Sequence, residues 1–267
     1  MDAVRIGIVG LGGICRDRHV LGFRGIEGVE LVSVVNRSPE SSRAAAEESG
    51  IGEVDDSWEA LVVRDDLDAV VIGTWPYMHR EISCAALAAG KHVFCQARMA
   101  MNLAEADAMV EASRASGKVT MLCPVPFGLS IDKTMVKLLE AGALGEVRLV
   151  TVQSFTDLFA ADDAVVNWRK DQRLSGLNMH TLGMYIEMVQ RWFGPTASVS
   201  AHTDIFVPSR PEADGGALKI EIPDQILALT RSKSGVPIQY AMNASVPNGD
   251  DRVEIYGSEK TLRYDVF

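Results

Sequence analysis

The chain has 267 residues, of which 47% are hydrophobic and 23% charged, a composition typical of globular proteins. The length suits one large domain or two moderate ones. The formal net charge of −10 argues against a nucleic-acid or anionic-membrane surface, because phosphates would be repelled. We therefore expect neither nucleic acid nor a membrane as a partner.

The first half alternates apolar strand-like runs with helix-like segments. Continuous apolar runs separated by amphipathic helices indicate a parallel sheet covered on both faces, and right-handed crossovers give a doubly wound α/β fold. We expect this domain to span residues 1–122. The expected strands are 4–10, 29–36, 68–74, 91–95 and 118–123, and the clearest expected helices are 40–49, 80–90 and 102–117.

The pattern changes after Cys123. A turn-rich junction, CPVPFG, precedes a helix expected over 131–146 that is stopped by glycine. We expect a second, α+β domain over 123–267, with a long helix between the strands of a mainly antiparallel sheet. The expected strands are 147–155, 198–207, 217–222, 226–232, 238–246, 252–257 and 262–266, and the long helix is 178–194.

The four cysteines lie in apolar segments without C-x-x-C spacing, and the first residues enter a strand without a secretory signal. We expect buried thiols in a reducing, cytoplasmic protein. His, Cys and carboxylate residues show no metal-ligand spacing, so we expect no metal.

A glycine-rich turn follows the first strand. VGLGGIC places Gly10, Gly12 and Cys15 at the spacing G-x-G-x-x-(G/A), although Cys15 replaces the usual small third residue. The first glycine permits a tight turn, and the second lets the backbone approach a pyrophosphate at a helix N-terminus. A second strand ending in polar Asn36 supplies the expected context, so we interpret the turn as a dinucleotide site rather than a purely structural one.

The residue after the second strand indicates the type of dinucleotide. An Asp there would accept from the ribose 2′-hydroxyl and repel a 2′-phosphate, whereas Asn36 is uncharged and is followed by Arg37 and Ser38. A cation and a hydroxyl suit a phosphate, although Arg37 could also be a solvated surface residue. We expect NADP, with NAD possible.

Four blocks together resemble the Gfo/Idh/MocA oxidoreductases: RIGIVGLGGI; DAVVIGTWPYMHREISCAALAAGKHVFC; LLEAGALGEVRLV with NWRKD; and VEIYGSEKTLRYD. The resemblance implies a Rossmann domain, an open-faced α+β substrate domain and homo-oligomers packed through the open sheet. It implies oxidation of a secondary alcohol on a sugar, polyol or related molecule. It also implies some tens of residues beyond Phe267, so the chain is a shortened homologue or a truncated product.

The resemblance suggests further cofactor contacts, and it departs from the family at the catalytic positions. Ala97 stands where the family's Glu-Lys-Pro places lysine, and Thr181 and Tyr185 align with its later Asp and His. We expect Arg98 and Thr181 to face a sugar-like or carboxylated substrate. The expected cofactor contacts are Gly10, Gly12, Gly13, Ile14, Asn36, Arg37, Ser38, Thr74, Trp75, Pro76, His79, Gln96, Ala97, Trp168 and Arg169.

A proton carrier must replace the missing lysine if the chain transfers hydride. The candidates are His180, Tyr185 and Lys170; Tyr185 could equally pack in the core, His79 could cap a helix, and Trp168 could pack in the core. We expect an NADP-dependent oxidoreductase acting on CH–OH groups with a remodelled proton-transfer site. The alternatives are a dinucleotide-binding regulatory protein without turnover, and non-redox glycoside chemistry assisted by a transiently reduced cofactor.

Overall fold

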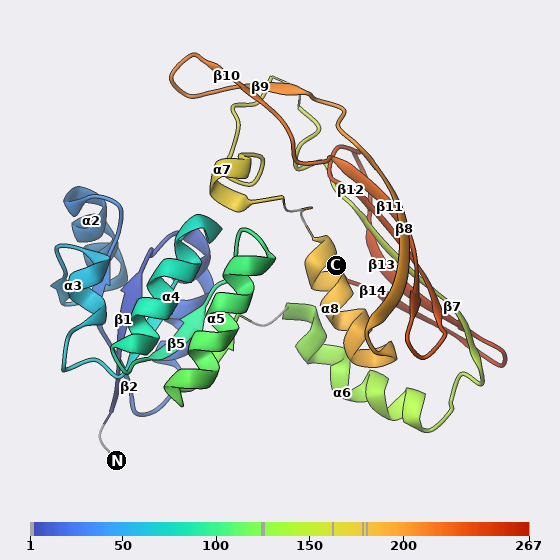
Figure 1. Ribbon diagram of the computed structural model, residues 1–267, viewed down its shortest axis with the longest axis horizontal. Helices are drawn as coiled ribbons and strands as arrows, with labels where there is room; N and C mark the ends of the chain where they lie inside the picture. The colour runs from blue at the N-terminus through green and yellow to red at the C-terminus, as the bar shows by residue number, and fades with distance from the viewer. Residues whose placement is uncertain (1–2, 124–125, 162, 178, 180, 267) are drawn as a thin grey trace. The chain divides into compact units, whose positions relative to one another are not determined.

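The computed structural model describes residues 3–123, 126–161, 163–177, 179 and 181–266, with the side chains of 126–130 left out (Figure 1). The chain divides into two compact units. Unit 1 comprises Met1–Cys123 and Arg173–Gly176, and unit 2 comprises Pro124–Gln172 and Leu177–Phe267. The short segment 173–176 thus belongs to unit 1, although in the sequence it lies between the two stretches of unit 2.

Unit 1 is a doubly wound α/β fold, as the alternation of apolar runs predicts. Its sheet has six parallel strands in the order β3-β2-β1-β4-β5-β6. This order is that of the Rossmann fold, with a reversal between β1 and β4. The strands are β1 (Val4–Val9), β2 (Val29–Val35), β3 (Glu53–Val54), β4 (Ala69–Ile72), β5 (His92–Cys95) and β6 (Thr120–Leu122).

Two apolar cores cover the two faces of this sheet. On one face, Ile8 and Val71 pack with residues of α2 (Pro39–Ser49) and of the first helical segment, η1 (Cys15–Val20) with α1 (Leu21–Arg24). On the other, Val70 and Ile72 pack with α3 (Trp58–Val62), α4 (His79–Ala88) and α5 (Leu103–Ser116). Successive strand side chains point to opposite faces, so buried strands need apolar residues at every position.

The helices of unit 1 begin and end where their local chemistry dictates. Ser38 caps α2 by accepting from the backbone N–H of Ser41, and Asn102 caps α5 by accepting from that of Glu105. Gly50 and Gly117 follow these helices with φ of 58° and 63°. Glycine adopts this left-handed conformation without steric cost, so both helices stop there.

Unit 2 is an α+β fold with a six-stranded sheet in the order β14-β13-β7-β12-β11-β8. Only β7 and β12 pair in parallel; the other pairs in this sheet are antiparallel, as the sequence predicts. The elements of unit 2 are α6 (Pro126–Glu140), β7 (Val147–Phe155), α8 (Leu182–Phe193), β8 (Thr196–Asp204), β9 (Ser209–Pro211), β10 (Ala217–Lys219), β11 (Gln225–Ser232), β12 (Pro237–Asn243), β13 (Asp251–Gly257) and β14 (Thr261–Asp265). Unit 1 also contains a short 3-10 turn, η2 (Pro76–Met78), before α4. The short α7 (Gln172–Ser175) begins at Gln172, the last residue of the first stretch of unit 2, and its other residues belong to unit 1.

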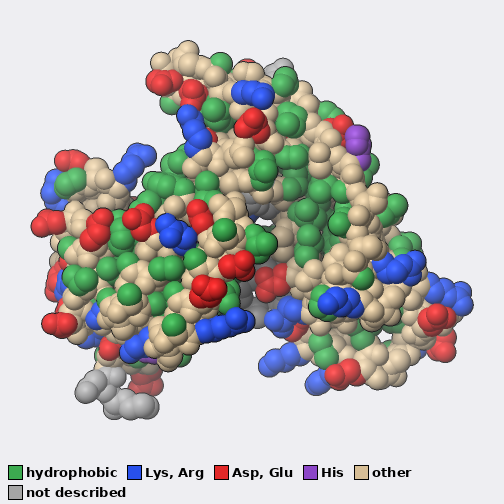
Figure 2. Space-filling view, in the orientation of Figure 1, with side chains coloured by type: hydrophobic (Ala, Val, Ile, Leu, Met, Phe, Trp, Pro, Cys, Tyr) green, Lys and Arg blue, Asp and Glu red, His purple; other side chains and the backbone are tan. Residues whose placement is uncertain are grey.

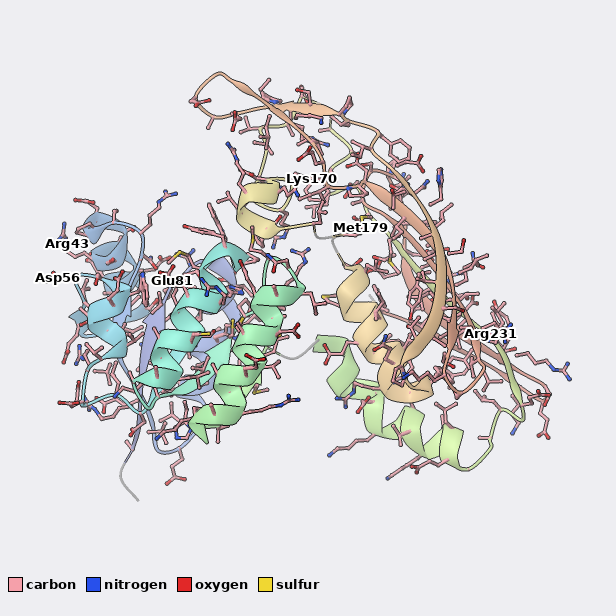
Figure 3. The ribbon with its side chains drawn as sticks, viewed as in Figure 1. Arg43, Asp56, Glu81, Lys170, Met179 and Arg231 are labelled. Carbon is pink, nitrogen blue, oxygen red and sulfur yellow. The ribbon has the colours of Figure 1, made fainter. Side chains whose placement is uncertain are left out.

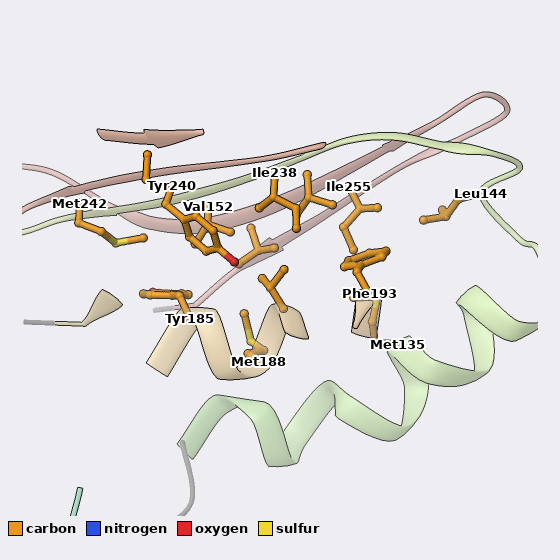
Figure 4. Close-up of a cluster of buried hydrophobic side chains, with 14 residues drawn as sticks. Met135, Leu144, Val152, Tyr185, Met188, Phe193, Ile238, Tyr240, Met242 and Ile255 are labelled. Atoms are coloured by element: carbon orange, nitrogen blue, oxygen red, sulfur yellow. The ribbon is translucent and has the colours of Figure 1, made fainter. Parts of the chain in front are cut away.

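The core of unit 2 lies between α8 and one face of its sheet (Figure 4). Met188 and Phe193 of α8 pack against strand residues such as Tyr240 and Ile255. The other face of the sheet carries exposed apolar side chains, with Leu227 44% and Leu229 65% exposed on β11. This face therefore lacks the helical cover that its opposite face has among the described residues.

Charged side chains of both signs are spread over the visible surface (Figure 2). Within the described part of the chain, no helix is long and apolar enough to span a bilayer.

Candidate dinucleotide site

A pocket of about 340 Å³ lies in unit 1 and is lined from the carboxyl ends of β1, β2 and β4. In open α/β sheets the ligand site forms at this edge, where the strand order reverses. The volume is within the range of small-molecule sites. The lining residues are Gly10, Leu11, Gly12, Asn36, Arg37, Ser41, Gly73, Thr74, Trp75 and Tyr77.

The glycine loop after β1 has the geometry that the motif predicts. Gly10 has φ of 84°, and a Cβ there would lie 2.6 Å from the backbone nitrogen of Thr74. A Cβ on Gly12 or Gly13 would meet no atom within 4 Å. The first glycine is therefore required by the fold, whereas the next two leave the loop backbone open to a ligand, with Ile14 47% exposed beside them.

Cys15 occupies the third motif position and is completely buried. A Cβ on Gly73 would come within 2.5 Å of the Gly10 carbonyl oxygen and closer still to the Cys15 sulfur. The thiol therefore fills the space where η1 packs against the end of β4, and Gly73 provides the room. Burial raises the pKa of Cys15 to about 12, so this thiol is a packing group and not a nucleophile.

Asn36 ties the end of β2 to the glycine loop. Its Oδ1 accepts from the backbone N–H of Leu11 at 2.7 Å, and its Nδ2 donates to the carbonyl oxygen of Ser41 at 3.2 Å. Arg37 lines the pocket and is exposed, and the described residues offer it no hydrogen bond or ion pair. Ser38 is the N-cap of α2, so its hydroxyl is engaged with Ser41. The pocket wall here is uncharged at Asn36 and cationic at Arg37.

The turn after β4 supplies the opposite wall. The Oγ1 atom of Thr74 is buried and has no hydrogen-bond partner among the described residues. Trp75 and Tyr77 are 36% and 42% exposed, and Pro76 begins η2. An unpaired hydroxyl and two partly exposed aromatic rings fit a ligand that supplies polar and flat groups. The sequence did not lead us to predict Leu11, Ser41, Gly73 and Tyr77 as residues of the pocket. Gly73 and Tyr77 could have been predicted, because they flank the predicted contacts Thr74, Trp75 and Pro76.

His79 does not line the pocket; it is completely buried at the start of α4. Its Nε2 lies 2.9 Å from the Thr74 carbonyl oxygen, and its Nδ1 lies 2.7 Å from the Arg98 carbonyl oxygen. The histidine therefore links the β4 turn to the loop after β5. Burial lowers the pKa of His79, and the surrounding backbone carbonyls and Glu105 oppose that shift.

The loop 96–101 holds the residues aligned with the family's Glu-Lys-Pro. The side-chain Oε1 of Gln96 lies 2.6 Å from Nε2 of His19, and the backbone N–H of Met101 donates to Glu105 at 3.1 Å. Ala97 and Arg98, joined by a cis peptide bond, are half-buried. The loop is thus fixed at both ends, and it carries Ala97 where the resemblance places a lysine.

The segment 173–176 of unit 1 packs closely on this loop. A Cβ on Gly176 would lie 2.2 Å from the carbonyl oxygen of Met101, and Gly176 has φ of 69°. Glycine is the residue that permits both this backbone conformation and this approach.

Trp168 and Arg169 belong to unit 2, where the Arg169 guanidinium stacks on the Trp168 ring with its carbon 4.3 Å from the ring centroid. The next residue, Lys170 (Figure 3), is a candidate proton carrier in the sequence, and the structure places it in a buried ion pair. Its side chain is 1% exposed and its Nζ lies 2.5 Å from Oδ1 of Asp224. Nζ also donates to the carbonyl oxygens of Ile222 and Pro223, so the hydrogen bonds of the ammonium stabilise the fold of unit 2.

Tyr185 is likewise a core residue and not an accessible acid. It is fully buried in α8 beside Tyr240 (Figure 4), and burial, with the charge of Asp251, raises its pKa. Proton transfer by this phenol would require a lowered pKa, and the burial of Tyr185 acts in the opposite direction. Thr181 precedes α8 and donates to the Oγ of Ser154 at 3.0 Å, inside unit 2. His180 lies outside the described residues.

A glycine-loop pocket at the reversal point of such a parallel sheet defines a dinucleotide-binding protein. Two family models extend this to nearly the whole chain. "Oxidoreductase family, NAD-binding Rossmann fold" matches residues 4–123, and "GFO/IDH/MocA C-terminal domain" matches residues 133–263. The chain belongs to the Gfo/Idh/MocA oxidoreductases.

Relatives with assigned activities include sugar-converting enzymes. The chain is 28% identical to a 1,5-anhydro-D-fructose reductase of Ensifer adhaerens, over 97% of its own length and 74% of the relative's. It is 24% identical to a levoglucosan dehydrogenase of Pseudarthrobacter phenanthrenivorans, over 98% of its length and 73% of the relative's. A solved oxidoreductase domain protein from Kribbella flavida matches with a TM-score of 0.90 and 27% identity, covering 99% of this chain and 74% of that one. A levoglucosan dehydrogenase in complex with NADH and L-sorbose matches with a TM-score of 0.91 and 21% identity, over 99% and 74% of the two chains.

Proposed function

We propose that this oxidoreductase transfers hydride between a nicotinamide dinucleotide and a secondary alcohol of a sugar-like molecule. The pocket at the ends of β1, β2 and β4 carries this proposal, because its open glycine loop and unpaired Thr74 hydroxyl suit a dinucleotide. When bound, the cofactor accepts or donates the hydride. The residues of this chain bind its phosphates at the glycine loop and hold the loop 96–101 in one geometry.

The preferred dinucleotide in this proposal is NADP. Asn36 places no negative charge at the end of β2, and its carboxamide is engaged with Leu11 and Ser41. Arg37 is exposed at the pocket, where a guanidinium makes charge-assisted hydrogen bonds to a 2′-phosphate. The solved relative with NADH at 21% identity shows the fold and does not bear on this preference.

Titration with NADPH and NADH, followed by nicotinamide fluorescence, tests the preference. Arg37→Ala should weaken NADPH binding by about 1–3 kcal/mol, roughly fivefold to 150-fold, and leave NADH unchanged. Arg43→Ala is the matched control, since Arg43 is exposed on α2, the helix that follows Arg37 in sequence, and pairs with Glu40 at 3.7 Å. Equal affinity of the wild type for both dinucleotides would contradict the assignment.

A second candidate is a dinucleotide-binding protein without turnover. Ala97 in place of the family's lysine and the burial of Tyr185 and Lys170 favour it. Incubation of the protein with NADP and a panel of polyols and sugars separates the two, with reduced cofactor measured by absorbance. Steady turnover supports the oxidoreductase, and tight binding without turnover supports the regulatory role. Product formed without net cofactor reduction would instead indicate cofactor-assisted glycoside chemistry.

We also propose that a second copy of the chain covers the exposed face of the unit 2 sheet. Leu227 and Leu229 on that face support self-association, which light scattering in solution measures.

A further inference from the structure

His79 is the one histidine among the described residues whose two ring nitrogens both face backbone carbonyl oxygens of functional loops. Thr74, on one side, lines the dinucleotide pocket. Arg98, on the other, belongs to the loop aligned with the family's Glu-Lys-Pro. The distances are 2.9 Å from Nε2 to the Thr74 oxygen and 2.7 Å from Nδ1 to the Arg98 oxygen.

A neutral imidazole carries one N–H, so it donates to one of these carbonyls at a time. The ring is completely buried, and its charged form is disfavoured there. Glu105, the carboxylate near the ring, already accepts from the backbone N–H of Met101 at 3.1 Å. The neutral ring must therefore choose between the β4 turn and the loop after β5, and the shorter contact is to Arg98.

We propose that His79 is a positioning residue whose Nδ1–H donates to the Arg98 carbonyl and thereby fixes the loop 96–101 against the dinucleotide pocket. This rests on the proposed function, because the loop matters for the nicotinamide half of a bound dinucleotide. The adenine half does not depend on this hydrogen bond, since separate hydrogen bonds from Leu11 and to Ser42 hold Asn36 in the pocket wall.

Two conservative substitutions separate the two ring contacts. The side-chain nitrogen of asparagine lies where the histidine Nδ1 lies, so His79→Asn keeps a donor for Arg98 and has no atom that replaces Nε2 at Thr74. The longer glutamine places its nitrogen near the Nε2 position, so His79→Gln puts a donor at Thr74 and removes the donor for Arg98. The pair therefore distinguishes a specific tie from general filling of the buried site.

The probes are NADPH, which spans the whole site, and 2′-phospho-ADP-ribose, which lacks the nicotinamide. His79→Gln should lose about fivefold to tenfold in NADPH affinity, the effect of one net hydrogen bond. His79→Asn should stay within about twofold of the wild type, the scatter expected where that bond is kept. Both variants should bind 2′-phospho-ADP-ribose like the wild type. Equal losses of NADPH affinity in both, or a larger loss in His79→Asn, would overturn the proposal.

Long-range ¹H–¹⁵N NMR of histidine-labelled wild-type protein at pH 8 tests the proposal without any variant. An Nδ1–H tautomer of His79 is the expected result, and an Nε2–H tautomer would refute it even where a variant fails to fold. The proposed function fails separately, by wild-type protein that binds neither NADPH nor NADH.

Discussion

Replacing Lys170 by methionine should destabilise unit 2 strongly without touching the dinucleotide pocket. Methionine keeps the apolar stem of the lysine and removes the ammonium. Asp224, itself completely buried, then loses the partner at 2.5 Å. The carbonyl oxygens of Ile222 and Pro223 also lose the donor they share, at 3.2 and 3.0 Å.

The magnitude follows from what remains around the carboxylate. Its Oδ2 still accepts from the backbone N–H groups of Phe206 and Val207 at 2.7 and 3.3 Å, so it is not bare. Breaking a buried ion pair on one side costs about 3–5 kcal/mol, because a buried charge is left uncompensated. We expect Lys170→Met to lie in this range, and the double variant with Asp224→Asn to recover part of the loss.

Urea unfolding followed by tryptophan fluorescence measures the effect, since Trp168 and Trp192 report on unit 2. Lys219→Met is the control; its side chain is 81% exposed and pairs with Glu221 at 3.3 Å, so we expect a change within about 0.5 kcal/mol. Unchanged stability in Lys170→Met together with lost turnover would refute this reasoning and return Lys170 to the proton carriers.

Three further outcomes are expected. At pH 8 iodoacetamide should modify Cys15 and Cys95 far more slowly in the folded than in the unfolded protein, because burial raises the pKa of each thiol to about 12. Mass spectrometry measures the labelling, and rapid modification of either thiol in the folded protein would contradict this prediction. The same raised pKa values make folding favour the protonated thiols, so this contribution to stability is present below pH 9 and is lost as pH rises toward 12. Ala97→Lys should not raise turnover on any simple polyol, because Arg98 adds like-charge repulsion in the half-buried loop and Tyr185 is no partner for it; a clear gain by absorbance assay would show a degenerate site rather than a rebuilt one.

The sequence predicts unit 1 well because its signals are local. Ile8 and Val71 sit in apolar runs that can only be strands buried on both faces, and Gly10 marks a turn that no larger residue can make. Tyr185 could also have been assigned from the sequence. It lies on the apolar stripe of α8 with Met188, Val189 and Phe193, the spacing of a helix face that packs on a core.

The remaining site residues depend on partners far away in the chain. Lys170 follows a Trp-Arg pair that suggests a cofactor cleft, yet its carboxylate partner is 54 residues further on. His79 resembles a cofactor contact because it follows the Thr74 turn, but its Nδ1 contacts the carbonyl oxygen of Arg98, 19 residues later in the sequence. No local sequence pattern shows that residues 173–176 belong to unit 1, where Gly176 packs against the backbone of Met101.

The geometry of the loop 96–101 separates binding from turnover in this chain. Gln96 is fixed by His19, Arg98 by His79 and Met101 by Glu105, so the loop is held at three points and would need little reorganisation to bind a ligand. Preorganisation of this kind supports affinity and alignment, but it does not move a proton, and the side chain of Ala97 has no group that can carry one. We therefore expect cofactor affinity at a level typical of an active enzyme, whereas any turnover would require a proton carrier other than Ala97.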